Sequence, residues 1–200
     1  SQTLTITVND VNEPPVITSN DGGDTYDLNF EEDEVLALTT ITSTDDDVSS
    51  SVTYKISGTD SDDFSVDSST GELIFVATPD FENPTDSDSD NVYTIDLIAE
   101  DNTNLTDQQT LTINVTNINY PPIITSNDGG DSETISFSEN DTLSVTVVTA
   151  SDDDVGSLAY SIIDYGDNNS FTIDSSTGEL NFVVKPDFEN PVDSDGDNIY

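Results

Sequence analysis

Acidic side chains gather in short clusters, and the spacing of these clusters is the feature of the sequence most able to do chemistry. Asp45-Asp46-Asp47 is an unbroken triplet, and Asp80 and Glu82 stand two residues apart. Two like charges about 4 Å apart repel by roughly 1 kcal/mol in water and roughly 4 kcal/mol near a protein surface. The sequence contains no His and no Cys, so the available metal ligands are hard oxygens. Such ligands suit Ca²⁺ best, and the clusters therefore predict calcium sites.

The charge balance excludes several classes of protein. The 200 residues include 43 Asp or Glu and 2 Lys or Arg, which gives a formal net charge of −41. Nucleic acids and anionic membrane surfaces repel such a chain. No run of about 18 apolar residues is present, so nothing in this sequence is expected to span a bilayer. For these reasons we expect neither nucleic-acid binding nor membrane insertion. Ser–His and Cys–His nucleophiles are impossible without His or Cys, so we also expect that the protein is not an enzyme.

The apolar residues follow the pattern of β-strands. An apolar content of 32 % at this net charge is typical of disordered chains, yet residues 4–8 and 93–99 alternate between apolar and polar. Residues 64–66 and 73–75 flank a turn in which Gly71 can take a positive φ, which predicts a hairpin. About seven strands in roughly 100 residues predict an all-β fold of tandem Greek-key β-sandwiches, similar to immunoglobulin domains. The expected core aromatics are Tyr54, Phe64, Phe75 and Tyr93.

The sequence repeats itself with an offset of 107 residues. Pro14 to Asp24 recurs as Pro121 to Asp131, and Asp45-Asp46-Asp47-Val48 recurs as Asp152 to Val155. A period of this length corresponds to one domain. We expect a piece of a longer tandem array with three segments: residues 1–13, the last strand and linker of a preceding repeat; residues 14–120, a complete repeat; and residues 121–200, a second repeat that is incomplete at its C-terminal end.

The ordered motifs of the complete repeat resemble those of the cadherin-like repeat family, in particular the tandem cadherin-like domains of bacteria. The motifs that carry the resemblance are Phe30-Glu31-Glu32-Asp33, Asp45-Asp46-Asp47, Tyr54-Lys55-Ile56, Phe64 to Leu73, Asp80-Phe81-Glu82, Ala99-Glu100-Asp101 and the linker Asp10-Val11-Asn12-Glu13-Pro14-Pro15. Several of these motifs recur in register in the second repeat. In this family, the motif acids bind Ca²⁺ at the junctions between successive repeats.

The resemblance implies three sets of ligands. The junction between the two repeats would use Glu32, Asp80, Glu82, Asn117, Asn119, Asp152 and Asp154. The junction before the complete repeat would use Asp10, Asn12, Glu13, Asp45, Asp47 and Asp101. A junction with a following repeat would use Glu139, Asp187 and Glu189. No single loop supplies the six to eight oxygens that Ca²⁺ requires, whereas several loops and a linker together could supply them.

The second linker departs from the family pattern. Asn117 stands where the first linker has Asp10, and Tyr120 stands where it has Glu13. Two formal charges are thereby lost, so we expect weaker or fewer ions at this junction.

A further acidic loop contains Asp86, Asp88 and Asp90, and it recurs at residues 193–197. It resembles the first half of an EF-hand loop, but Asn91 replaces the Gly of the sixth position and Leu97 replaces the Glu of the twelfth. A Ca²⁺ site and a solvated acidic turn remain equally consistent with this pattern.

These observations favour a calcium-binding structural or adhesive module that forms the Ca²⁺-stiffened stalk of a large secreted or cell-surface protein. Its expected partners are Ca²⁺, neighbouring repeats of the same chain, and a cell-surface protein or glycan. A carbohydrate-binding accessory domain or a self-associating module is the alternative, and exposed Tyr26, Tyr120 or Tyr165 would support sugar binding. The acidic clusters alone would also fit a salt-adapted soluble protein.

Overall fold

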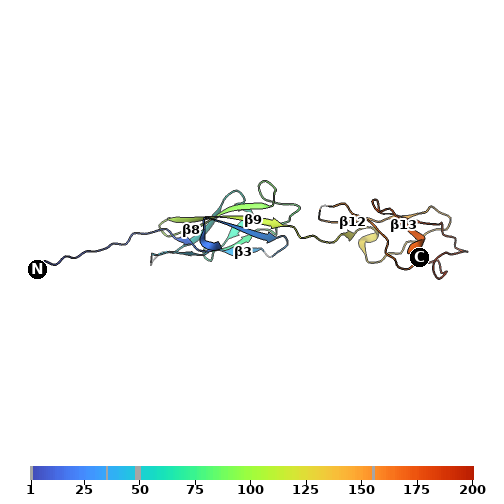
Figure 1. The fold of residues 1–200 in the computed structure, drawn as a ribbon, viewed down its shortest axis with the longest axis horizontal. Coiled ribbons are helices and arrows are strands. Elements are labelled where there is room, and N and C mark those ends of the chain that lie inside the picture. Colours follow the sequence, from blue (N-terminus) through green and yellow to red (C-terminus); the bar gives the residue numbers. More distant parts are fainter. Residues whose placement is uncertain (1, 35, 48–50, 155) are drawn as a thin grey trace. The chain divides into compact units, whose positions relative to one another are not determined.

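The computed structural model describes residues 2–34, 36–47, 51–154 and 156–200 and divides into two compact units, Ser1–Ile118 and Asn119–Tyr200 (Figure 1). Val48 and Val155, which close the repeated Asp-Asp-Asp-Val motif, lie outside the described residues. No helix in the described part of the chain is long and apolar enough to cross a membrane.

The first unit contains two β-sheets and a short two-stranded ribbon. The larger sheet has the order β2 (Thr25–Glu31), β9 (Thr106–Thr116), β8 (Val92–Glu100) and β5 (Thr53–Ser57). The smaller sheet has the order β3 (Ala37–Thr40), β7 (Glu72–Phe75) and β6 (Phe64–Val66), and the ribbon pairs β1 (Val16–Ile17) with β4 (Ser43–Thr44). Two 3₁₀ turns, η1 (Asn20–Gly22) and η2 (Ser61–Asp63), complete the unit.

The chain passes from the larger to the smaller sheet of the first unit at β2–β3, returns through β4 to β5, and crosses again at β5–β6 and at β7–β8. Strand β2 runs parallel to β9, whereas β8 is antiparallel to both of its neighbours. These crossings produce a Greek-key β-sandwich, so the predicted all-β fold is confirmed.

The alternating residues of β8 and β9 form one wall of the core. Tyr93, Ile95 and Leu97 are buried on β8, and Leu111 and Ile113 are buried on β9. The register places Tyr93 opposite Ile113 and Ile95 opposite Leu111, so both strands present their apolar side chains to the same layer. The expected core aromatics Phe64, Phe75 and Tyr93 are buried, and Tyr54 packs against them partly buried.

The predicted hairpin joins β6 to β7. The Oδ1 atom of Asp67 accepts hydrogen bonds from the backbone N–H groups of Ser69 and Thr70, each at 2.8 Å. Gly71 has φ 76°, and a Cβ atom there would collide with the carbonyl oxygen of Ile41. This turn therefore needs both the acidic acceptor and the glycine, as the sequence pattern indicated.

The second unit repeats the ribbon and the smaller sheet of the first at the same offset of 107 residues. The ribbon pairs β10 (Ile123–Ile124) with β12 (Ala150–Ser151), and the sheet has the order β11 (Ser144–Val147), β14 (Glu179–Phe182) and β13 (Phe171–Ile173). The 3₁₀ turns η3 (Asn127–Gly129) and η4 (Asn168–Ser170) recur at equivalent places.

The larger sheet has no counterpart among the described residues of the second unit. Among the described residues of the first unit, β2 and β5 pair only with β9 and β8, respectively, and the 200 residues include no positions equivalent to β9 or to most of β8. Residues 132–138 and 158–163 consequently form no strand, although Tyr160 and Ile162 match the β5 residues Tyr54 and Ile56. The local pattern is present, but the hydrogen-bonding neighbour is absent from this sequence.

The same principle applies to residues 2–13, which contain no assigned strand despite the alternation of Leu4, Ile6 and Val8. These three side chains are exposed. A strand requires a neighbour for its backbone groups, and the described part of the chain supplies none here.

Candidate metal centres

Glu32, Asp80 and Glu82 come together at one end of the first unit. Each offers a carboxylate oxygen, and these oxygens all lie within 4.8 Å of one another. Glu32 directly follows β2, whereas Asp80 and Glu82 lie in the loop between β7 and β8. Glu32 stands 48 positions before Asp80 in the sequence. The structure nevertheless brings these acids together, as the motif pattern indicated.

Backbone amides orient these carboxylates. Glu32 exposes only 5 % of its surface. Its Oε1 atom accepts a hydrogen bond from the N–H of Ile118 at 2.7 Å, and its Oε2 atom accepts one from Phe81 at 2.9 Å. The Oδ1 atom of Asp80 accepts from the N–H of Glu82 at 3.0 Å. Asp80 Oδ1 also accepts from the N–H of Asn83 at 3.0 Å, so both of its lone pairs are used. The two Glu32 oxygens and Asp80 Oδ2 each retain a lone pair that can coordinate a cation, and the hydrogen bonds fix the direction of these carboxylates.

The linker residue Asn117 reaches the same cluster. Its Nδ2 group donates a hydrogen bond to Oε1 of Glu82. Strands β2 and β9 are parallel, so the chain leaves β9 at the end of the sheet where Glu32 follows β2. This topology explains why the linker and the three acids share one end.

A second group lies at the opposite end of the larger sheet. Asp101 follows β8, which is antiparallel to β9, and it is buried. Asn12 Nδ2 donates to Asp101 Oδ2 at 2.6 Å, and the N–H of Glu13 donates to Asp47 Oδ2 at 3.0 Å. The N–H of Asp47 in turn donates to Asp45 Oδ1 at 2.9 Å. Five of the predicted ligands are thus joined in one network.

Asp10 is the predicted member of this set that the structure does not bring into the network. It is exposed, and within the described residues it makes no hydrogen bond to the group. It lies two residues before Asn12, in the stretch that has no assigned strand.

The pKa of Asp101 results from opposing effects. Burial alone would raise the pKa, but hydrogen bonds from Asn12, Leu105 and Thr103 together outweigh burial and leave the pKa below its usual value. Asp101 is therefore an ionised ligand candidate at neutral pH.

The second unit repeats part of each arrangement. The N–H of Tyr120 donates to Asp154 Oδ2 at 2.6 Å, and the N–H of Asp154 donates to Asp152 Oδ1 at 3.1 Å, as in the first unit. The Nδ2 group of Asn119 donates to the carbonyl oxygen of Tyr120 at 3.1 Å. Carboxylate oxygens that lie within 4.8 Å of one another are also offered by Glu139, Asp187 and Glu189.

Two further acidic groups lie in equivalent loops of the two units. One loop precedes β8, which begins at Val92, and the other precedes Ile199, the counterpart of Val92. Their members are Asp86, Asp88 and Asp90 in the first unit and Asp193, Asp195 and Asp197 in the second. The charge of Asp90 raises the pKa of Asp88, and the charge of Asp197 raises the pKa of Asp195. The close carboxylates therefore repel one another in both loops.

Asp60 is a positioning residue that the sequence patterns did not single out. It is buried, and it accepts hydrogen bonds from the N–H groups of Ser87 at 2.9 Å and Thr94 at 2.7 Å. Its counterpart Asp167 accepts from the N–H of Ser194 at 2.6 Å. The recurrence of this Asp at the offset of 107 was the signal available in the sequence.

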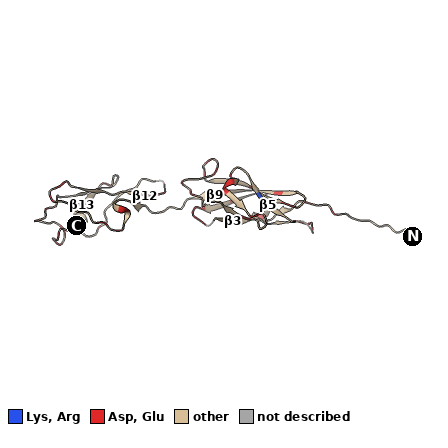
Figure 2. Ribbon diagram, turned by 180° about the vertical axis from the view of Figure 1, so that it is seen from behind, with Lys and Arg blue, Asp and Glu red and all other residues tan. Residues whose placement is uncertain are grey.

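Basic side chains do not neutralise these clusters. The chain has two basic residues, both Lys, and 43 acidic residues, which Figure 2 colours blue and red along the ribbon. The only salt bridge among the described residues joins Lys55 Nζ to Glu100 at 2.7 Å. Lys185 Nζ donates to the carbonyl oxygen of Asn140 at 3.4 Å. Cations that balance the acidic groups must therefore come largely from solution.

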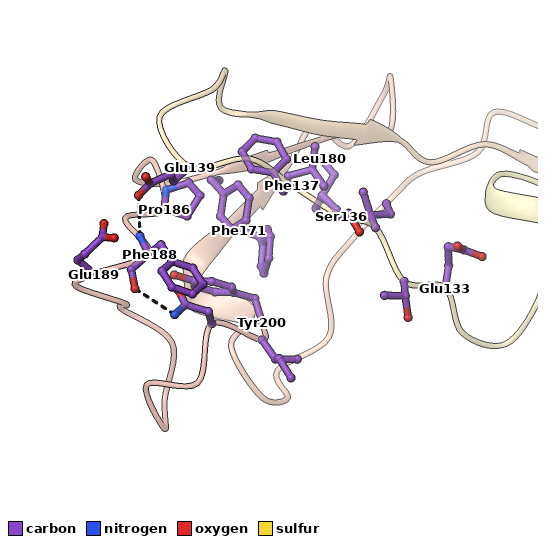
Figure 3. A pocket seen from close by; sticks show the side chains of 16 residues that line it. Glu133, Ser136, Phe137, Glu139, Phe171, Leu180, Pro186, Phe188, Glu189 and Tyr200 are labelled. Carbon is purple, nitrogen blue, oxygen red and sulfur yellow. Dashed lines mark hydrogen bonds between the residues drawn. The ribbon is translucent and has the colours of Figure 1, made fainter.

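A cavity of about 790 Å³ opens in the second unit. Figure 3 shows Phe137, Phe171 and Tyr200 beside it, with the acidic side chains Glu139 and Glu189 at its edge. Five of its lining residues are the counterparts of the buried first-unit residues Phe30, Phe64, Leu73, Phe75 and Tyr93. The cavity therefore lies where β8 and β9 close the core of the first unit, and it is not a separate ligand pocket.

The three tyrosines considered for sugar binding differ in exposure. Tyr165 exposes 84 % of its surface and Tyr120 exposes 44 %, but Tyr26 packs against the core of the first unit.

A β-sandwich whose ribbon and smaller sheet recur along one chain, with acidic groups where its strands end, is typical of a modular repeat protein. Residues 26–116 match the family model of the cadherin domain. Protocadherin Fat 1 of Homo sapiens is 30 % identical over 185 residues, which are 89 % of this chain and 4 % of that protein. The chain thus spans a small part of the curated relative that it matches.

Two solved structures share the fold. Human protocadherin-24 EC1-2 has 21 % identity and a TM-score of 0.55, with 87 % of this chain and 81 % of that chain covered. Human CDH23 EC21-23 has 21 % identity and a TM-score of 0.56, with 88 % and 57 % covered. The family-model match places residues 26–116 in the cadherin-like repeat family, and the solved structures share the fold. Cadherin domains are calcium-dependent structural and adhesive modules of extracellular proteins.

Proposed function

We propose that this chain is a calcium-binding module of the stalk of a large secreted or cell-surface protein, and that Ca²⁺ stiffens the linkers between its repeats. The observation that carries the proposal is the cluster of Glu32, Asp80 and Glu82, whose oxygens lie within 4.8 Å of one another. A buried carboxylate beside two others is strongly unfavourable without a cation. The chain offers hard oxygen ligands and almost no positive charge, which suits Ca²⁺.

Three carboxylates supply fewer oxygens than the six to eight that Ca²⁺ takes. We propose that the linker and the following repeat supply the remainder through Asn117, Asn119, Asp152 and Asp154. The covalent chain supports this assignment, because only Ile118 separates the two linker asparagines. A cation held by ligands from both sides of the linker would restrict its bending.

The side-chain amide of Asn117 would have to rotate before its oxygen could bind a metal ion. Its Nδ2 group donates to Glu82, whereas a cation needs the amide oxygen. Rotation of the side-chain amide would replace a hydrogen bond with a metal ligand at the same place.

The proposed setting is extracellular, where millimolar Ca²⁺ would fill weak sites with Kd values on the order of 10⁻⁴–10⁻³ M. We propose from the linker and loop motifs that the whole protein is a bacterial surface adhesin. The proposed partner of the whole protein in adhesion is a cell-surface protein or a glycan. A carbohydrate-binding or self-associating role has weaker support, because Tyr26 is packed against the core.

Calorimetric Ca²⁺ titration of the 200-residue chain tests the proposal. Glu82→Gln removes one charge from the cluster, and we expect it to weaken the corresponding sites by about tenfold or more. The matched control is Glu72→Gln, because Glu72 is an exposed residue of β7 outside the cluster. Equal Ca²⁺ binding by the two variants would contradict the proposal. Glu32→Gln is a poorer test, since Glu32 also accepts two backbone hydrogen bonds.

A further inference from the structure

The acidic loop of each repeat forms a compact group separate from the Glu32 cluster. In the first unit its carboxylates belong to Asp86, Asp88 and Asp90, and the oxygens lie within 4.8 Å of one another. In the second unit, Asp193, Asp195 and Asp197 form the same arrangement. The two loops therefore preserve the placement of their charges as well as their sequence.

A buried oxygen without a hydrogen-bond donor lies in each loop. Asp193 exposes 8 % of its surface, and its Oδ1 atom has no hydrogen-bond partner among the described residues. Its Oδ2 atom accepts from the N–H of Asp197 at 2.7 Å. The two oxygens of one carboxylate are adjacent, so the unpartnered oxygen belongs to the acidic group. A buried anionic oxygen of this kind calls for a cation.

The first unit shows a related orphan in the same loop. Asn91 Oδ1 is buried and has no hydrogen-bond partner in the described part of the chain. Its Nδ2 group donates to the carbonyl oxygen of Phe81 at 2.9 Å. This contact identifies the nitrogen of the amide, because a carbonyl oxygen can only accept, and the other amide atom is therefore an available oxygen.

We propose that each of these loops is a calcium site contained within a single repeat, with Asp86, Asp88 and Asp90 as ligands in the first unit and Asp193, Asp195 and Asp197 in the second. Water would complete the coordination, as is common for Ca²⁺. The site lacks the Glu that closes an EF-hand loop, so it binds more weakly than an EF-hand. It does not depend on the ions proposed for the linkers.

The contacts of Phe81 connect the loop to the Glu32 cluster. Asn91 Nδ2 donates to the carbonyl oxygen of Phe81, and the N–H of Phe81 donates to Glu32 Oε2 at 2.9 Å. The second unit repeats the connection through Phe188, whose N–H donates to Glu139 and whose carbonyl accepts from Asn198 (Figure 3). An ion that orders the loop therefore also restrains the peptide between Asp80 and Glu82. This coupling, unlike the loop site itself, rests on the proposed function.

The test is the number of Ca²⁺ ions bound by the 200-residue chain, measured by equilibrium dialysis with metal analysis. The test variant combines Asp88→Asn and Asp195→Asn, both at exposed positions where folding should be preserved. The control combines Asp24→Asn and Asp131→Asn, an equal change of charge at equivalent exposed positions of the two repeats. Circular dichroism of both variants in Ca²⁺ checks that each folds like the parent chain.

We expect the test variant to bind two fewer ions than the control, one for each loop. Equal ion numbers in the two variants would overturn the loop site and identify the loops as solvated acidic turns. Glu82→Gln distinguishes this proposal from the linker sites, because it should leave the loop ions in place. If Glu82→Gln leaves the Ca²⁺ affinity unchanged while the loop variant loses two ions, the proposed linker site fails and the loop site stands.

Discussion

Glu32 is a proposed calcium ligand whose carboxylate is already oriented by the protein backbone. It is held by the N–H groups of Ile118 and Phe81, so its direction is set before any ion arrives. The motif pattern indicated its role, but the two backbone donors could not be predicted from the sequence. They depend on the parallel pairing of β2 with β9, which brings the linker next to the end of β2.

The two missing charges of the second linker predict a change in affinity. Asn117→Asp combined with Tyr120→Glu restores the acids found in the first linker, and we expect calorimetry to show Ca²⁺ affinity about tenfold or more higher. The control, Asn29→Asp combined with Tyr165→Glu, makes the same charge change at exposed positions elsewhere. Unchanged affinity in the linker variant, or an equal gain in the control, would show that these positions do not contribute to a calcium site.

The hairpin acid Asp67 predicts a dependence of stability on pH. Backbone hydrogen bonds from Thr70 and Ser69 hold its pKa below the usual value. A lowered pKa in the folded state means that the contribution of Asp67 is complete above the unfolded-state value of about 3.9 and is lost as the pH falls through the folded-state value. The equivalent Asp174, bonded chiefly by the side chain of Ser176, has a pKa lowered to about 2.

Urea unfolding of the parent chain and of Asp67→Asn between pH 6 and about pH 2 checks this prediction. Asn retains an acceptor oxygen but does not titrate, so the difference in stability between parent and variant should shrink as the pH falls below about 4. A difference that stays constant over this range would show that the charge of Asp67 does not stabilise the turn.

At the scale of the elements, the predictions succeeded where a strand and its neighbours were both present. The alternation of β8 and the hairpin of β6 and β7 follow from the period of two and from Gly71. Residues 132–138 and 158–163 form no strand, because the strands that would pair with them are not among the described residues. The sequence pattern identifies the exposed and buried faces of a strand, whereas its neighbour decides whether the strand forms.

Gly71→Ala tests the hairpin as an element. A positive φ is unfavourable for Ala, and the new Cβ would collide with the carbonyl oxygen of Ile41. We expect urea unfolding to show the first unit destabilised by about 2–5 kcal/mol. Gly23→Ala is the control, since Gly23 has a negative φ and only ordinary contacts. A loss no larger than that of the control would contradict this account of the turn.

At the scale of the whole molecule, the two units differ in how completely their cores are covered. Strands β8 and β9 bury Leu97, Leu111 and Ile113 in the first unit, whereas the equivalent region of the second unit is the open cavity beside Phe171 and Tyr200. Hydrogen exchange should therefore be slow in β8 and β9 and fast in residues 132–138 and 158–163. Equal protection in both places would show that the second unit closes its core in another way.

The repeat itself was evident from the sequence, since the strands of the second unit recur at the offset of 107 residues. The acidic groups around Glu32 and Asp101 could be predicted from the ordered, recurring motifs, except that Asp10 is not brought into the Asp101 group. The buried, unpartnered oxygen of Asp193 was not predictable, because it depends on how the loop packs in three dimensions.

The central claim is that Ca²⁺ stiffens the linker between the repeats, and small-angle X-ray scattering of the 200-residue chain tests it most directly. Scattering is measured with Ca²⁺ and with a chelator, and bound metal is determined in parallel. The account predicts that Ca²⁺ binds, that the maximum dimension increases and that the scattering becomes characteristic of a more rigid particle. Identical scattering in the two conditions, with no bound metal, would contradict it and identify the acidic clusters as an adaptation for solubility or salt.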